Sequence, residues 1–227
     1  MVRGERISKA YVIIAIFIIL LIIITILFSG NQLIWAIIDD KYLVNGWKDS
    51  GDSVSYNRFF GLEKQGSLTY VIDENVDNLY PAFITITSIK TIFMKSEEDL
   101  LKTTIETINK AAEANNIIID KNSSYSGNRV LNIGHKTNFV IFDGNKTNEI
   151  VTEEIRIIGE TWNCGFSGSS VICIGVSQIT DNKHNNPDYN YTHWIEIIGD
   201  TEGTFVNKFN SYNFINSNGL LFNVKCH

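Results

Sequence analysis

The chain has 227 residues, of which 44% are hydrophobic and 19% charged, and its formal net charge is −6 at pH 7. The first 40 residues carry three basic and three acidic side chains, so the net negative charge belongs to the remainder of the chain. This balance argues against nucleic acid and against an anionic lipid surface as binding partners, because both attract a basic patch. The remainder is long enough for one core of ordinary size, and we expect one domain.

The most apolar stretch lies near the N-terminus, at residues 10–28, AYVIIAIFIILLIIITILF. A helix of this length without a charge is enough to cross the roughly 30 Å hydrocarbon core of a bilayer. A cleavable signal peptide is the alternative, but its apolar part spans only about 7–15 residues and ends at a small-residue cleavage site. We therefore expect a retained transmembrane helix and a single-pass protein.

The charges beside this segment predict its orientation. Three basic residues and one acidic residue precede it, whereas Asp39 and Asp40 follow it. The positive-inside rule then makes residues 1–9 a cytoplasmic tail in the cell membrane and places the C-terminal domain outside the cell.

Two details of the segment stay open. Arg3-Gly4-Glu5 resembles the processing site of a type IV pilin leader, although pilins continue directly into apolar residues and this chain does not. Residues 33–38, LIWAII, keep the helical spacing and place Trp35 where an interfacial anchor belongs, which extends the predicted helix to residue 38.

Residues 41–66 follow an irregular pattern, with Trp47 and other aromatic residues among Asp, Ser and Gly, and we expect a stem that packs against the domain. The domain itself then spans residues 67–227. Its first two strands are predicted at residues 67–72 and 82–93, which are dense in β-branched residues and should pair around the loop between them.

The clearest helix of the domain begins after Ser96, which opens a capping box with Asp99. The predicted core face comprises Leu101, Ile105, Ile108 and Ala112. This periodicity ends at residues 115–116, so we expect a helix of about five turns that covers one face of a sheet.

The second half of the domain alternates strand and turn signals. Further strands are predicted at residues 117–119, 129–133, 137–142, 154–162, 171–179 and 219–224. In the fourth of these, charged residues alternate with isoleucines at 154–157, which is typical of a sheet with one solvent-exposed face. A second helix is predicted to start at Asn185 or Asn186, with Pro187 in its first turn, and to end at Gly199.

The order of these elements is β-β-α-β-β-β-β-α-β. It predicts an α+β domain, an antiparallel sheet packed by two helices. The order resembles the topology of the photosystem II PsbP proteins and Mog1, a likeness of topology alone that implies nothing about function.

Three cysteines outside the cell imply one disulfide and one thiol, and three pairings are open. Cys164 and Cys173 lie opposite each other if the turn between them is centred at 168–169, but opposed strand residues sit at or beyond the reach of a disulfide. Cys226 lies in a tail that a bridge would pin to the sheet. We favour Cys164 to Cys226, with Cys173 packed as a small hydrophobic residue.

A metal site can be drawn from Asp181 with His184, or from the cysteines and all four histidines, His135, His184, His193 and His227. Neither set has the tight spacing of a recognisable zinc site, so we expect no metal and no cofactor, with His135, Asp181 and His184 as the candidates otherwise. A thiol hydrolase needs a base beside its nucleophile, and His135 with Cys164 is the pair that the sequence offers.

Three sequons, at Asn122, Asn145 and Asn190, are glycosylation acceptors if the domain is extracellular. A chain this rich in Asn, Ser and Thr contains several sequons by chance, so they carry little weight.

Several stretches together carry a resemblance to a known family. They are NIGHKTNFVIFDG at 132–144, GETWNCGFSGSSVICIGVSQIT at 159–180, HNN at 184–186, HW at 193–194, DTEGTF at 200–205 and GLLFNVKCH at 219–227. Over roughly residues 60–227 the chain resembles a family of uncharacterised membrane-anchored proteins of euryarchaea such as methanogens and Thermococcales. In that family W-x-C and a terminal C-H recur together, which implies that Cys164 and Cys226 are partners. The resemblance implies location and architecture, not an activity.

Three hypotheses of function follow. The first is a non-enzymatic, membrane-anchored extracellular module that binds an unknown ligand or another envelope protein, with the lipid bilayer as its partner through residues 10–28. The second is a metal-dependent or thiol hydrolase that uses His135, Asp181 and His184. The third is a structural subunit whose helix packs inside a larger membrane complex.

Overall fold

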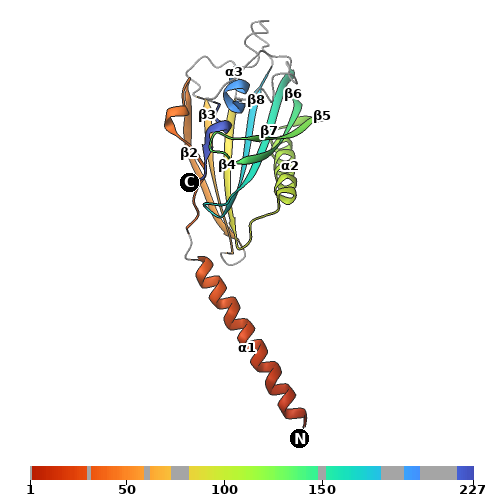
Figure 1. Cartoon of the computed structure of the whole chain (residues 1–227). Helices are drawn as coiled ribbons and strands as arrows, with labels where there is room; N and C mark the ends of the chain where they lie inside the picture. Colours follow the sequence, from red (N-terminus) through yellow and green to blue (C-terminus); the bar gives the residue numbers. More distant parts are fainter. Residues whose placement is uncertain are drawn as a thin grey trace.

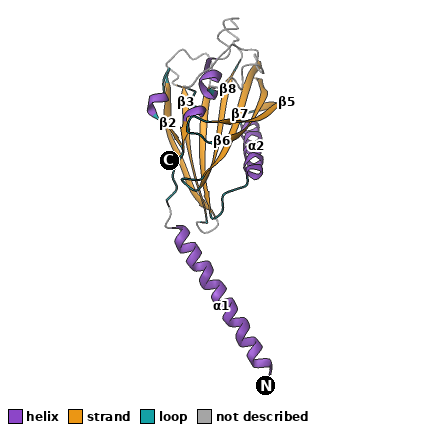
Figure 2. Cartoon of the chain, viewed as in Figure 1, coloured by secondary structure: helices purple, strands orange, loops and turns teal. Residues whose placement is uncertain are grey.

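The computed structural model describes residues 2–29, 32–58, 62–72, 82–147, 152–179, 192–199 and 219–227. A long N-terminal helix, α1 (Val2–Ser29), leaves one end of a domain that is built mainly from strands (Figures 1 and 2). Among the residues whose side chains are described, no helical stretch is long and apolar enough to count as a candidate membrane span.

The centre of the domain is an antiparallel sheet of seven strands. In spatial order these are β2 (Trp47–Arg58), β3 (Glu63–Ile72), β4 (Ala82–Thr91), β8 (Ser169–Gln178), β7 (Thr152–Cys164), β6 (Lys136–Thr147) and β5 (Ile117–Val130). A separate pair joins β1 (Ile37–Ile38) to β9 (Val224–Lys225), so the segment that follows α1 meets the C-terminal segment. The α+β class and the antiparallel sheet predicted from the order of elements are confirmed.

The helix α2 (Glu97–Ala114) covers one face of this sheet. Its N-cap is Ser96, which accepts a hydrogen bond from the Asp99 N–H at 3.1 Å, as predicted. The buried side chains of α2 are Leu100, Thr104, Ile108 and Ala112. The helix lies close to the β7 backbone at Gly159, where a Cβ would collide with Thr104 Cγ2. The predicted helix is therefore present, but its first two buried positions each lie one residue before the predicted Leu101 and Ile105, which are half-buried.

Short segments cover the opposite face: the helix α3 (Thr192–Ile198), the 3₁₀ turn η3 (Leu221–Asn223) and the β1–β9 pair. Because both faces are covered, β8 is buried along its whole length. Arg156 on β7, expected on a solvent-exposed face, is buried at 6% exposure and donates to Asp143 Oδ1 at 2.7 Å. The predicted single wet face is therefore wrong at this strand.

The predicted extension of α1 to residue 38 is also wrong, because residues 32–38 lie along the sheet instead of continuing the helix. The Ala36 N–H donates to Ser88 Oγ at 2.7 Å, and the Ile38 N–H donates to Tyr70 Oη at 3.1 Å. Trp35 packs over Gly66, where a Cβ would lie 2.8 Å from the indole ring. The apolar spacing that indicated a helix thus serves packing against β3 and β4.

Three further elements differ from the prediction. Residues 41–66, expected as an irregular stem, contribute the edge strand β2, whose polar residues are almost all exposed. The strands predicted at 117–119 and 129–133 are one strand, β5, with a register shift between Asp120 and Tyr125. Residues 219–224 form η3 and enter β9 only at their end. Polar edge strands and short turns lack the apolar alternation that marks a half-buried strand.

The second predicted helix corresponds to α3. Its predicted end at Gly199 agrees with the positive φ of that residue, 49°, a conformation that glycine adopts readily. Asn185, Asn186 and Pro187, which should begin the helix, lie outside the described residues.

Candidate functional site

A disulfide joins Cys164 to Cys226, with the Cα atoms 6.5 Å apart. Cys164 is the last residue of β7 and Cys226 follows β9, so the bridge fastens the C-terminal segment to one end of the sheet. This is the pairing that the sequence favoured. Cys173 is the free, buried cysteine, as expected.

The β7–β8 hairpin shows why Cys164 and Cys173 are not partners. Cys164 lies opposite Ser169, and Cys173 lies opposite Glu160. The turn comprises residues 165–168 and is not centred at 168–169, so the condition under which the two cysteines would oppose each other is not met. Burial, together with the nearby Glu160 carboxylate, raises the pKa of the Cys173 thiol well above its ordinary value, which disfavours the reactive thiolate.

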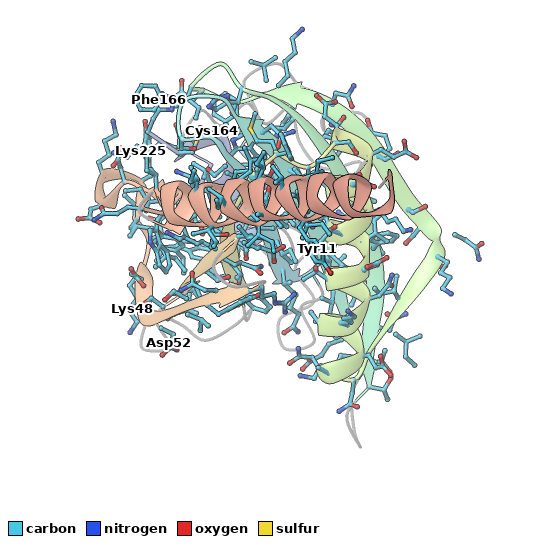
Figure 3. All side chains as sticks on the ribbon, turned by 90° about the horizontal axis from the view of Figure 1, so that it is seen from below. Tyr11, Lys48, Asp52, Cys164, Phe166 and Lys225 are labelled. Atoms are coloured by element: carbon cyan, nitrogen blue, oxygen red, sulfur yellow. A yellow bond between two sulfur atoms is a disulfide. The ribbon has the colours of Figure 1, made fainter. Side chains whose placement is uncertain are left out.

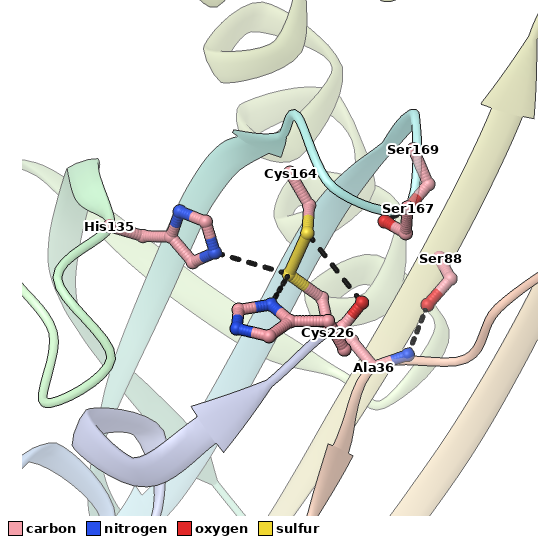
Figure 4. The surroundings of a disulfide bond; sticks show 8 residues. Ala36, Ser88, His135, Cys164, Ser167, Ser169 and Cys226 are labelled. Carbon is pink, nitrogen blue, oxygen red and sulfur yellow. Dashed lines mark hydrogen bonds between the residues drawn. A yellow bond between two sulfur atoms is a disulfide. The ribbon is translucent and has the colours of Figure 1, made fainter.

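Two histidines lie against the disulfide. His135 Nε2 is 3.3 Å from Cys226 Sγ, and His227 Nδ1 is 3.8 Å from the same atom. Figure 4 shows His135 pointing at the bridge from the neighbouring loop. The ligand-type atoms of His135, Cys164, Cys226 and His227 all lie within 4.8 Å of one another. We refer to these four residues as the Cys/His cluster.

The loop between β5 and β6 positions His135. Gly134, with a φ of 83°, allows the chain to turn tightly before His135. Asn132 then ties this loop to the C-terminal segment, because its N–H donates to the Phe222 carbonyl at 3.1 Å and its side-chain amide donates to Asn223 Oδ1 at 2.8 Å. His135 therefore faces Cys226 through contacts that do not involve the disulfide.

Aromatic rings border the Cys/His cluster. His135 stacks on Trp162 with ring centroids 6.4 Å apart, and Phe166 contacts His227 at 5.1 Å. Trp162 is buried, and its indole N–H has no hydrogen-bond partner among the described residues. Both cysteines are buried, whereas His227 is exposed, so the cluster reaches the surface through its histidines.

The electrostatic surroundings favour an uncharged His135. Burial is the main reason that its pKa lies below the ordinary value, and the charge of the neighbouring His227 lowers it further. A neutral imidazole accepts a hydrogen bond or ligates a metal. The oxidised Cys164 offers no thiolate for attack, so the thiol hydrolase drawn from this His–Cys pair has no nucleophile here.

His193 lies in a different cluster from His135. Glu196 on α3 accepts hydrogen bonds from Asn45 Nδ2 at 2.7 Å, Trp47 Nε1 at 2.9 Å and His193 Nδ1 at 3.0 Å. Burial opposes ionisation of Glu196, but these three hydrogen bonds outweigh it, and its pKa is lowered. The cluster links α3 to the start of β2 and is structural.

The other predicted site residues are separate from the Cys/His cluster or lie outside the described part. Asp181 and His184, the remaining metal candidates, are outside the described residues, as is the sequon Asn190. The sequon Asn122 lies on the edge strand β5 and the sequon Asn145 on its neighbour β6, and both residues are exposed, so an acceptor is accessible at each.

A buried ion pair that the sequence did not predict lies on the face that α3 covers. Arg129 Nε donates to Glu160 Oε1 at 2.7 Å, and both side chains are almost fully buried. Arg129 also donates to the Ile198 carbonyl at 2.7 Å, which fastens the end of α3 to the sheet. The one signal in the sequence was a charged residue inside each of two predicted strands, and this signal does not reveal that the two side chains meet.

Comparison with family models, curated proteins and solved structures gives no match to this chain. Its function therefore rests on the geometry of its own residues.

Proposed function

We propose that this protein is a single-pass, membrane-anchored module whose sheet domain lies outside the cell and binds a ligand or another envelope protein. The observation that carries the proposal is the surface of α1. From Tyr11 to Ile23 every side chain is exposed, and all except Ala15 are large and apolar. These residues span more than three turns and so occupy all sides of the helix. A helix that is apolar all round requires an apolar environment, which a bilayer supplies.

The connection between α1 and the domain supports this arrangement. The Lys90 ammonium donates to the Gln32 carbonyl at 3.2 Å, so the chain that follows α1 enters the domain where β4 ends. This end of the sheet faces α1 in Figure 1. With α1 in a bilayer, the end of β4 would be the part of the domain nearest the lipid.

Exposed apolar residues gather at that same end of the domain. Residues 92–94, which follow β4, are exposed, and Phe93 is 84% exposed. Phe166, 77% exposed, lies in the β7–β8 turn, and Asn163, near the end of β7, donates to the Lys95 carbonyl at 2.8 Å. Figure 3 looks at the molecule from the side of α1 and shows Phe166 at the edge of the domain. Aromatic residues in such positions suit the interfacial region of a membrane.

The disulfide supports the outer location of the domain, because structural disulfides form and persist in oxidising compartments. The basic flank at residues 1–9 supports an N-terminus in the cytoplasm. The archaeal envelope is part of the proposal and rests on the sequence resemblance.

The test is fractionation of cells that produce the full chain with an epitope at each end. We expect the protein to stay in membranes washed with alkaline carbonate. Protease added to intact cells should remove the C-terminal epitope and spare the N-terminal one. A chain released without detergent, or a C-terminal epitope that resists the protease until the cells are opened, would overturn the proposal.

A matched pair of variants assigns the anchoring to α1. Leu20→Arg places a charge near the middle of the apolar segment, which costs about 2.5–3.5 kcal/mol of insertion free energy, and should shift the chain toward the soluble fraction. Ile34→Arg adds the same charge at an exposed position beyond α1 and should leave the chain in the membrane.

The hypothesis of a subunit in a larger membrane complex shares the anchor and differs in the size of the particle. Native electrophoresis in mild detergent, with crosslinking in intact membranes, distinguishes the two: a module that meets its partner transiently migrates alone, whereas a subunit migrates in a persistently larger species.

A further inference from the structure

We propose that the Cys/His cluster binds one zinc ion when the disulfide is reduced, with Cys164, Cys226, His135 and His227 as the four ligands. Two thiolates and two imidazoles in a tetrahedral arrangement are the donor set of structural zinc sites. The proposal does not depend on the membrane anchor.

The distances fit a tetrahedral site. With Zn–S bonds of about 2.3 Å and Zn–N bonds of about 2.0–2.1 Å, a sulfur and a nitrogen in one tetrahedron lie about 3.5 Å apart. The two histidine nitrogens lie 3.3 Å and 3.8 Å from Cys226 Sγ, on either side of that value. Zinc would hold the two sulfurs about 3.8 Å apart, which cysteines whose Cα atoms are 6.5 Å apart reach by side-chain rotation.

The ligands stay near one another without the disulfide. Asn132 bonds to Phe222 and Asn223 and so keeps the His135 loop against the C-terminal segment. On the other side of that segment, β9 pairs with β1, and Lys225 forms an ion pair with Asp39. Reduction therefore frees the two sulfurs while the backbone around them remains fastened.

The surroundings also suit a bound ion. The ligands come from three separate parts of the chain, the β5–β6 loop, the end of β7 and the C-terminal segment, and all converge on one point. Trp162, stacked on His135, has a buried indole N–H without a partner among the described residues. Such a donor favours a negatively charged or polar group nearby, and hydrogen-bond donors around the ligands accompany metal sites.

The oxidised, disulfide-bonded state and the reduced, zinc-bound state interconvert in two steps. A dithiol transfers two electrons and two protons to the Cys164–Cys226 bond, yields two thiols and itself becomes a disulfide. Zn²⁺ then displaces the two thiol protons into solvent, and the two neutral imidazoles each contribute a lone pair. Reoxidation by a disulfide of the same class reverses both steps and releases the ion. The C-terminal segment is thus fastened to the sheet in either redox state, by a covalent bond or by zinc.

The experiment uses the full chain in detergent micelles, reduced with dithiothreitol and desalted without oxygen, and titrated with zinc chloride. We expect one zinc per reduced chain by elemental analysis and none per oxidised chain. Bound zinc should protect Cys164 and Cys226 from alkylation, and cobalt in place of zinc should give the visible absorption of a tetrahedral thiolate site.

Histidine variants assign the ligands. His135→Ala and His227→Ala keep both cysteines, so each folds with its disulfide before reduction. Loss of a ligand should weaken zinc binding by at least the roughly 10- to 100-fold that loss of an outer-sphere partner costs. His193→Ala, outside the cluster, is the matched control and should bind zinc as the wild type does. Near-ultraviolet circular dichroism of the reduced chains monitors their fold.

Three results would overturn the proposal. They are a reduced wild-type chain that takes up no stoichiometric zinc, histidine variants that bind zinc as tightly as the wild type, and a reduced chain that loses its near-ultraviolet signal and does not regain it with zinc.

Discussion

One face of the central sheet is covered by a single long helix, and the opposite face is covered by several short segments. On the first face α2 contributes 18 residues, and its contacts with the sheet are almost entirely apolar. On the second face α3 has seven residues, η3 three and β9 two, and each is tied to the sheet or to a neighbouring loop by polar or covalent bonds.

The two faces are held differently because the segments that cover them differ in length. A helix of about five turns buries a continuous apolar stripe and carries its own cap, whereas segments of one or two turns are unstable alone and depend on tertiary bonds. Two such bonds are the ion-paired Arg129 that holds the end of α3 and the disulfide that holds the C-terminal segment. The stability of the first face should therefore be most sensitive to changes in packing, and the stability of the second face to the loss of individual bonds.

The largest effect is expected from Cys226→Ser. The bridge spans 62 residues of sequence, and in the chain-entropy model its loss costs about 4 kcal/mol of unfolding free energy. Urea unfolding measures the loss, and hydrogen exchange should show the segments on the α3 face losing protection before α2. Cys173→Ala retains the bridge, so the oxidised and reduced forms of this variant should differ in unfolding free energy by as much as those of the wild type. Equal loss of protection on both faces would contradict the comparison.

Ile108→Ala tests the α2 face. Ile108 is fully buried between the helix and the sheet, and truncation of such a residue costs about 2–5 kcal/mol, since a cavity remains. We expect about 3 kcal/mol by urea unfolding, with the disulfide still formed. Ile118→Ala, at a position 73% exposed, should change stability little. A loss confined to the α3 face in hydrogen exchange would refute this assignment.

The Glu196 cluster makes part of the stability of the α3 face depend on pH. The pKa of the Glu196 carboxyl is lowered in the folded state. Its contribution to the free energy of unfolding is therefore fully present above the ordinary carboxyl pKa of 4.5 and is lost as the pH falls through the lower folded value. Glu196→Gln should cost about 1.5 kcal/mol at neutral pH, because hydrogen bonds to a charged group are replaced by neutral ones. The gap between variant and wild type should narrow below pH 4.5. Glu106→Gln, exposed on α2, controls for the loss of a surface carboxylate. A gap that does not change with pH would show that the carboxylate is not the cause.

The smallest effect is expected at the start of α2. Ser96→Ala removes the side chain that accepts from the Asp99 N–H, and loss of such a cap costs about 1 kcal/mol. Ser96→Thr should retain most of the stability. Thermal unfolding of both variants is the measurement, and equal stability of Ser96→Ala and wild type would mean that the α2 face does not depend on its cap.

The elements that the sequence predicted correctly are those whose signal is local. Ser96 and the helical spacing after it marked α2, and runs of β-branched residues marked β3, β4 and β8. The edge strand β2 escaped prediction because most of its side chains are polar and exposed. The apolar run at 33–38 was misread as helix because burial against a sheet and burial in a helix both select apolar residues.

In the Cys/His cluster too, some residues could be identified from the sequence, whereas their proximity could not. Cys164, Cys226 and His135 were identifiable from residue type, because cysteines outside a cell are expected to pair and a histidine is a frequent ligand. Asp181 and His184 were selected for their closeness in sequence, which says little about the closeness of side chains. The convergence of His135 and His227 on one sulfur follows from the β5–β6 loop meeting the C-terminal segment. No local spacing encodes that meeting.

The sequence by itself determined the apolar N-terminal segment, the α+β class, α2 with its cap, and one disulfide with one buried thiol. Each of these depends on residue type or on short-range periodicity. Only the tertiary structure decided the strand order, the burial of both sheet faces, the Arg129–Glu160 pair and the Cys/His cluster. The physical reason is that these features join residues tens of positions apart, and their proximity arises from the packing of the whole sheet.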